Sequence, residues 1–176
     1  MRYLLTFSCY GHRLHGQHPG TVDRRHNAYG APMAPPSRAR LSYVRRTMKH
    51  PRFHLDARGR SAVLESLHAA CRKPGWTIWA AHVRSTHVHV VIEAECPPEK
   101  LLCQLKAAAT AHLQNLADPS GATRLHPWSR HGSTRYLWTD DQFRAAMAYV
   151  IEEQGPPLAL FVHPAWQVTA VHATEP

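Results

Sequence analysis

The sequence predicts an α+β fold, a ferredoxin-like antiparallel sheet with helices packed on one face. Three observations favour it. Strand-like and helix-like segments alternate along the chain. Two strand-like segments are joined by only three residues, which is typical of an antiparallel hairpin. The 176 residues are enough for one domain with a real hydrophobic core. A sheet covered by helices buries the apolar sides of all these segments.

The first strand is predicted over residues 2–10, where apolar, β-branched and aromatic residues dominate. Prolines and glycines then interrupt a basic segment, so we expect a long Pro-rich loop over about residues 16–40. This loop could contact a phosphate backbone, or it could be a solvated insertion.

The central part of the chain predicts a helix and a hairpin. Apolar side chains recur at helical spacing over residues 57–72, and Lys73-Pro74-Gly75 ends that helix. A strand over residues 76–83 follows. The tight connection Arg84-Ser85-Thr86 then leads into a second strand, which begins at His87.

Two further helices are predicted downstream. Pro97-Pro98-Glu99 is typical of a helix N-terminus, and the apolar residues after it repeat at helical spacing. After a basic-aromatic stretch over residues 128–138, Thr139 offers an N-cap for a last helix that extends to about Gln154. We expect one domain over residues 1–160 and a C-terminal tail over 161–176.

The charge balance favours a polyanionic partner. The chain has 21 Lys and Arg against 12 Asp and Glu, a net charge of +9. Nucleic acid is the usual partner of such an excess, although an inert basic surface is the alternative. The candidate phosphate contacts are basic side chains in and near the predicted connections: Arg84, Lys106, Arg130, His131 and Arg135.

The cysteines and the N-terminus indicate a cytosolic protein. None of the four cysteines forms a C-x-x-C pair, so we expect reduced thiols rather than a disulfide framework or a zinc knuckle. The N-terminal apolar run covers only residues 3–7, so neither a signal peptide nor a membrane span is expected.

His87 and His89 are the candidate metal ligands. Side chains two apart on a strand point to the same face, so both imidazoles could hold one ion. Since the chain has 15 histidines, such a pair also arises by chance. Glu153 is the expected third ligand. Gln154 is the weaker candidate, because it would point about 100° away on a helix. Imidazole and carboxylate ligands suit Mn²⁺ better than Mg²⁺.

Tyr149 is the candidate nucleophile. It precedes Glu153 by four residues, so the two would share one helix face and could lie over the histidine pair. A metal that polarises a phosphodiester would allow Tyr149 to attack it and form a phosphotyrosine. A tyrosine has an ordinary pKa near 10 and needs a nearby cation to ionise.

These residues resemble the HUH single-tyrosine transposases, which include the single-strand insertion-sequence and REP-associated tyrosine transposases. The likeness runs from Arg2 to about Leu160. It includes His87-Val88-His89 after a hairpin, the helical Leu105-Lys106-Ala107 and the helix that bears Tyr149. Two departures are Thr86, where the family often has Asn or Asp, and the long Pro-rich loop.

The resemblance implies a single-stranded DNA endonuclease and strand transferase with an HUH-endonuclease-like fold and a 5′-phosphotyrosine intermediate. Tyr149 would be its nucleophile, and His87, His89 and Glu153 would bind Mg²⁺ or Mn²⁺. The family often has Gln or Asn at the third ligand position. The implied partner is hairpin-bearing single-stranded DNA in the bacterial cytoplasm, bound by a monomer or a homodimer.

Three alternatives stay open at this point. The protein could be a non-catalytic, domesticated nucleic-acid hairpin-binding protein that does not need Tyr149. Two histidines and a carboxylate also describe a non-haem iron oxygenase site, but that leaves the basic charge and Tyr149 without a role. A zinc hydrolase would lack a convincing general base.

Overall fold

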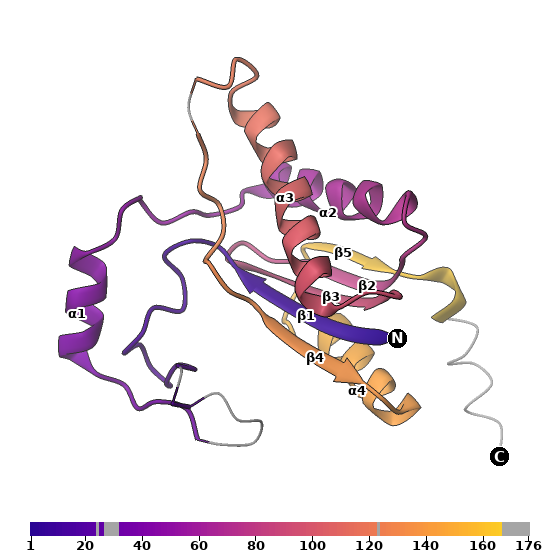
Figure 1. Cartoon of the computed structure of the whole chain (residues 1–176), viewed down its shortest axis with the longest axis horizontal. Helices are drawn as coiled ribbons and strands as arrows, with labels where there is room; N and C mark the ends of the chain where they lie inside the picture. The colour runs from indigo at the N-terminus through magenta and orange to yellow at the C-terminus, as the bar shows by residue number, and fades with distance from the viewer. Residues whose placement is uncertain (24, 27–31, 123, 167–176) are drawn as a thin grey trace.

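The structure, a computed structural model, describes residues 1–23, 25–26, 32–122 and 124–166. Its helices and strands follow the chain in this order (Figure 1): β1 Arg2–Ser8, α1 Arg38–Arg46, α2 Ala57–Arg72, β2 Thr77–Val83, β3 His87–Glu93, α3 Pro98–Ala117, β4 Ser133–Leu137, α4 Asp140–Ile151 and β5 Ala159–Val162. Among the helices of these ranges, none has both the length and the apolar character needed to cross a lipid bilayer.

The strands form one five-stranded sheet in the order β4-β1-β3-β2-β5, with antiparallel neighbours throughout. The order β4-β1-β3-β2, with α2 and α3 as the connecting helices, is the ferredoxin-like arrangement. The predicted α+β class is therefore confirmed. It also follows that β3, which carries the histidine pair, lies at the centre of the sheet.

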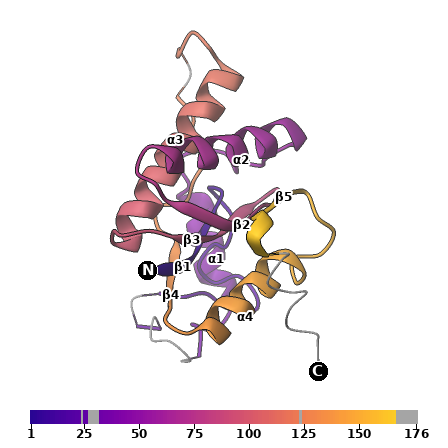
Figure 2. The same cartoon turned by 90° about the vertical axis from the view of Figure 1, so that its right-hand side faces the viewer.

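The expectation that all helices cover one face of the sheet is wrong. Figure 2 shows α2 and α3 on one side and α4 on the other. The first core contains Leu5, Leu67 and Leu105, and the second contains Val91 and Met147. The reason lies in β3, where the side chains between its two end residues are buried on both faces. Such a strand needs cover on both sides.

Three predicted boundaries also need correction. The last helix ends at Ile151, not near Gln154, so residues 152–154 form a turn. The predicted boundary between residues 160 and 161 cuts through β5, which pairs with β2 along Ala80–Val83. The loop predicted over residues 16–40 gives way to α1 at Arg38.

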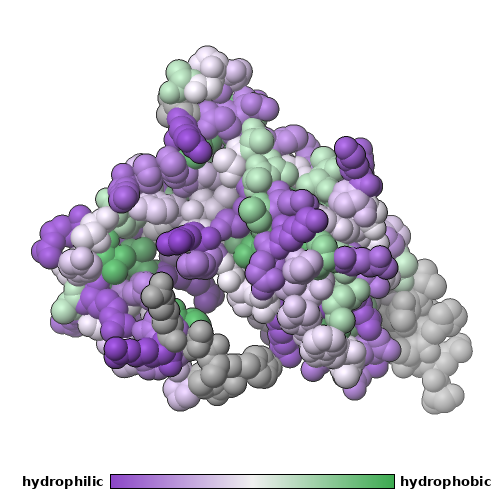
Figure 3. Space-filling view, in the orientation of Figure 1, coloured by the Kyte–Doolittle hydropathy of each residue, from purple (hydrophilic) through white to green (hydrophobic). Residues whose placement is uncertain are grey.

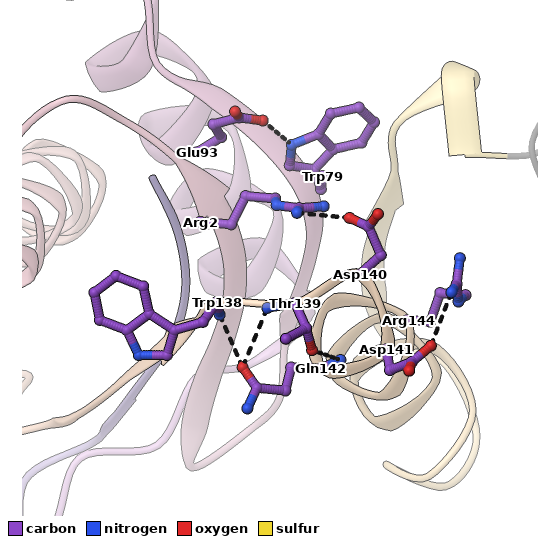
Figure 4. A network of polar contacts seen from close by, with 9 residues as sticks. All are labelled: Arg2, Trp79, Glu93, Trp138, Thr139, Asp140, Asp141, Gln142 and Arg144. Carbon is purple, nitrogen blue, oxygen red and sulfur yellow. Dashed lines mark hydrogen bonds and ion pairs between the residues drawn. The ribbon is translucent and has the colours of Figure 1, made fainter.

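The N-terminal end of α4 is held in place by polar contacts (Figure 4). Thr139 and Gln142 form a capping box, which satisfies backbone N–H groups at the start of the helix. Arg2 on β1 binds Asp140 at 2.7 Å and lies over the ring of Phe143. These contacts fix α4 against the sheet, and thereby fix the position of Tyr149 in its last turns.

Candidate active site

His87 and His89 lie side by side on β3, on the face that α4 covers. Their ring centroids are 4.8 Å apart. His89 is 2 % exposed, and the Tyr149 ring meets it edge-on at a centroid distance of 5.2 Å. The structure therefore brings together both predicted histidines and the predicted nucleophile.

A threonine hydroxyl holds each imidazole through its Nδ1 atom. Thr6 Oγ1 on β1 lies 2.8 Å from His89 Nδ1, and Thr86 Oγ1 lies 3.0 Å from His87 Nδ1. Partners of this kind fix the orientation of metal-binding histidines. Sequence reasoning missed Thr6, although the antiparallel pairing of β1 with β3 places it directly opposite His89.

Both histidines are held in the neutral form. Burial lowers the pKa of His87 to about 4, and the Arg13 guanidinium contributes in the same direction. Burial also lowers the pKa of His89 to about 3, helped by His87 and then by Arg13. At neutral pH both imidazoles therefore keep a lone pair that can bind a metal ion.

Gln154, not Glu153, reaches the histidine pair. Hydrogen bonding to the Gln154 side chain, whose amide oxygen can accept from an imidazole N–H, opposes the lowering of the pKa of both His87 and His89. Its Nε2 atom donates to the Tyr149 carbonyl at 2.9 Å, which leaves its amide oxygen available. Glu153 is exposed in the turn after α4. Within the described ranges, no three His, Cys, Asp or Glu side chains form a metal-binding group.

His82 and Arg84 position the turn that carries Gln154. His82 is fully buried. Its Nδ1 lies 3.0 Å from the Val150 carbonyl, and its Nε2 lies 3.2 Å from the Leu158 N–H. Because a carbonyl can only accept, Nδ1 carries the proton. Arg84 donates to the Pro156 carbonyl. The sequence analysis assigns no role to His82, and its signal is its place in the strand that pairs with the His87–His89 strand.

Arg13 is a further residue that the sequence analysis missed. Its charge lowers the pKa of both histidines. Its backbone has a φ of 53°, a left-handed conformation that is uncommon for a residue other than glycine. Arg13 is exposed and follows Cys9 by four residues, and the Cys9 N–H donates to the Thr86 carbonyl at 2.7 Å, next to His87.

The predicted phosphate contacts fall into two groups. Lys106 Nζ donates to the carbonyls of Ser129 and Arg130, so it supports the segment before β4. Arg84, as described above, supports the turn after α4. Arg130 and His131 are exposed and line an open cavity beside α3. Arg135 lies opposite Leu4 in the sheet register and so shares the face of Thr6 and the histidines.

Acidification is expected to destabilise the fold through the histidine pair. In the unfolded chain His87 and His89 become protonated below about pH 6.5. In the folded protein their pKa values are about 4 and about 3, so they stay neutral until the pH is much lower. The free energy of unfolding should fall by about 1.4 kcal/mol per pH unit for each histidine in that interval. Urea unfolding followed by circular dichroism between pH 7.5 and 4.5 measures this slope.

The matched variants are His87→Gln/His89→Gln, which should flatten the slope, and the exposed His131→Gln, which should leave it unchanged. An equal slope in the wild type and the double variant would show that other groups cause the acid sensitivity.

Comparisons with known proteins yield fold neighbours only. No protein-family model and no curated protein matches the sequence. One similar solved structure is described as a REP-associated tyrosine transposase bound to a REP hairpin. It has 10% identity and a TM-score of 0.45, over 85% of this chain and 63% of that one. The chain therefore spans less than two thirds of that protein.

A second similar structure is described as a candidate transposase from Deinococcus radiodurans R1. It is 14% identical to this chain, with a TM-score of 0.43. The alignment covers 88% of this chain and 90% of that one.

Proposed function

We propose that this protein is a single-stranded DNA endonuclease and strand transferase of the tyrosine transposase type, which uses Mn²⁺ or Mg²⁺. The observation that carries the proposal is the contact of Tyr149 with His89, beside a second histidine and the Gln154 amide. A hydroxyl nucleophile next to neutral imidazoles and an amide oxygen is suited to phosphodiester chemistry.

The residues fit a divalent ion. In the tautomer that carries its proton on Nδ1, each histidine donates to a threonine hydroxyl and presents its Nε2 lone pair for metal binding, and the Gln154 oxygen supplies a third donor. Nitrogen and oxygen donors of this kind suit Mn²⁺, with Mg²⁺ second. When bound, the ion supplies Lewis-acid stabilisation of the charge that develops on the phosphate.

The protein's own side chains then account for the reaction. The Tyr149 oxygen attacks the phosphorus and loses its proton to solvent. The bond from phosphorus to the 3′ oxygen breaks, and that oxygen takes up a proton to become a 3′ hydroxyl. The 5′ phosphate stays on Tyr149, so attack by another 3′ hydroxyl rejoins the strand without ATP.

One further residue supports this reaction. Arg13, whose charge lowers the pKa of both histidines, would neutralise a non-bridging phosphate oxygen. Since Tyr149 and His89 touch within one chain, the proposal needs only a monomer that acts in cis.

The test is to map the attachment site. The protein is incubated with hairpin-bearing single-stranded DNA and Mn²⁺, digested with protease and nuclease, and examined by mass spectrometry. We expect a nucleotide on the peptide that contains Tyr149, and none when EDTA is present. Tight binding without any adduct would overturn the catalytic proposal and favour a non-catalytic hairpin-binding protein. A nucleotide on another residue would overturn the role of Tyr149.

A further inference from the structure

Residues 9–55, which we call the arm, carry almost all of the net positive charge. The arm contains nine of the 21 Lys and Arg but only one of the 12 Asp and Glu. The remainder of the chain is therefore close to neutral. Figure 1 shows the described part of the arm and its helix α1 to the left of the sheet, away from α2, α3 and α4.

The arm is attached to the sheet at its base by backbone hydrogen bonds. The Tyr10 N–H donates to the Pro127 carbonyl, the Phe53 N–H to the Tyr10 carbonyl and the Leu55 N–H to the Ser85 carbonyl, at 2.9 to 3.0 Å. These bonds join both ends of the arm to the edge of the molecule where β1 ends and β3 begins. That is also the edge at which His87 lies.

Helix α1 packs on its own loop and not on the main cores. The Ser37 N–H donates to the Gly16 carbonyl at 2.9 Å. Gly16 has a φ of +88°, and a Cβ atom there would lie 2.5 Å from the Ser37 carbonyl oxygen. No residue of α1 is fully buried, and Leu41 and Val44 are half-buried. The helix therefore contributes little to the hydrophobic core, and most of its side chains are on the protein surface.

Three arginines of α1 form one exposed basic face. Arg38, Arg45 and Arg46 lie within a sector of about 100° around the helix axis, given 100° per residue. All three are exposed, and none has an ion pair with another described residue. Arg40, by contrast, binds Asp23 at 3.3 Å. Hydrophilic side chains line the outer edge of the arm in Figure 3.

No acidic side chain of α1 neutralises this basic face. The guanidinium groups of Arg38, Arg45 and Arg46 therefore repel one another, and Arg38 also lies at the positive N-terminal end of the helix dipole. A merely solvated surface would carry acids and bases together, as the rest of this chain does. A polyanion would remove the repulsion.

We infer that the arm binds the phosphate backbone of single-stranded DNA through Arg38, Arg45 and Arg46, and holds the strand toward Arg13 and the histidine pair. The arm begins beside the histidine strand, because the Cys9 N–H donates to the Thr86 carbonyl at 2.7 Å and Ser8 pairs with His87. Arg13 follows four residues later, so one basic element extends from α1 to the edge of the candidate active site. The inference takes its ligand from the proposed function, but it concerns binding and not cleavage.

The test is the salt dependence of binding to fluorescein-labelled oligothymidylate, measured by anisotropy. Each phosphate contact on a single strand contributes about 0.7 to the slope of log affinity against log salt. The variant Arg38→Gln/Arg45→Gln/Arg46→Gln should therefore lower that slope by about 2. The variant with lysine at the same three positions should keep the slope. Circular dichroism checks that both variants fold.

The matched control removes three exposed charges from the opposite side of the molecule. Arg72→Gln/Lys73→Gln/Lys100→Gln changes the ends of α2 and α3. It should leave the slope nearly unchanged. An equal fall in both triple variants, or no fall in the arm variant, would overturn the inference.

Adduct formation separates this inference from the proposed function. At saturating hairpin DNA the arm variant should still become linked to DNA. If the wild type forms no adduct but the slope falls only in the arm variant, the arm inference stands and the catalytic proposal fails. If the wild type forms the adduct but the slope does not change in the arm variant, the catalytic proposal stands and the arm inference fails.

Discussion

Tyr149→Phe is expected to abolish the covalent DNA adduct while the protein stays folded and binds DNA as before. The substitution removes the only atom that attacks phosphorus in the proposed reaction, so adduct formation should fall at least about 10³-fold. The phenylalanine ring can keep the edge-on contact with His89, so little stability is lost. A denaturing gel with labelled hairpin DNA and Mn²⁺ measures the adduct, and anisotropy measures binding.

The matched control for this prediction is Tyr136→Phe. Tyr136 is an exposed tyrosine on β4 whose ring stacks on Trp138. Its substitution removes the same hydroxyl group as Tyr149→Phe, but away from the histidines. We expect a wild-type amount of adduct. A persistent adduct in Tyr149→Phe would show that another residue is the nucleophile.

Gln154→Ala is expected to weaken metal binding and DNA cleavage together. The side chain interacts with both His87 and His89, so its removal takes away the third donor of the proposed site. We expect Mn²⁺ affinity to fall by at least about ten-fold. Isothermal titration calorimetry with Mn²⁺ measures the affinity without depending on activity, and the initial rate of adduct formation measures the reaction.

Glu153→Ala is the control, because it changes the neighbouring exposed residue in the same turn. Its Mn²⁺ affinity should stay within about two-fold of the wild type, since solvent separates an exposed carboxylate from the site. A larger loss in Glu153→Ala than in Gln154→Ala would restore Glu153 as the third ligand.

The difference between Glu153 and Gln154 arises at the end of α4. Helical spacing favours Glu153 because it lies four residues after Tyr149, and Gly155-Pro156-Pro157 predicts a helix that continues to about Gln154. Instead, α4 ends at Ile151, and side chains donate hydrogen bonds to carbonyl groups of its last turn. His82 donates to the Val150 carbonyl, and Gln154 donates to the Tyr149 carbonyl. Contacts from another strand cannot be read from the periodicity of the helix itself.

The sequence does not predict β5 as a strand. It does predict the first strand, the central hairpin, the common face of His87 and His89, the late helix with Tyr149 and the basic charge. These follow from local rules, since the strand period of two and the helical period of 3.6 depend only on neighbouring residues. The antiparallel ferredoxin-like sheet followed as well, because short connections restrict how successive strands pair.

The face that each helix covers, the end of α4 and the polar residues that support the fold all depend on contacts between elements. Lys106 and Arg84 looked like phosphate contacts but bind backbone carbonyls. Arg13, Thr6 and Gln154 reach the histidines through packing between elements far apart in the chain. The physical reason is that a local pattern fixes the direction of a side chain relative to its own element. Its partner depends on how the elements pack together.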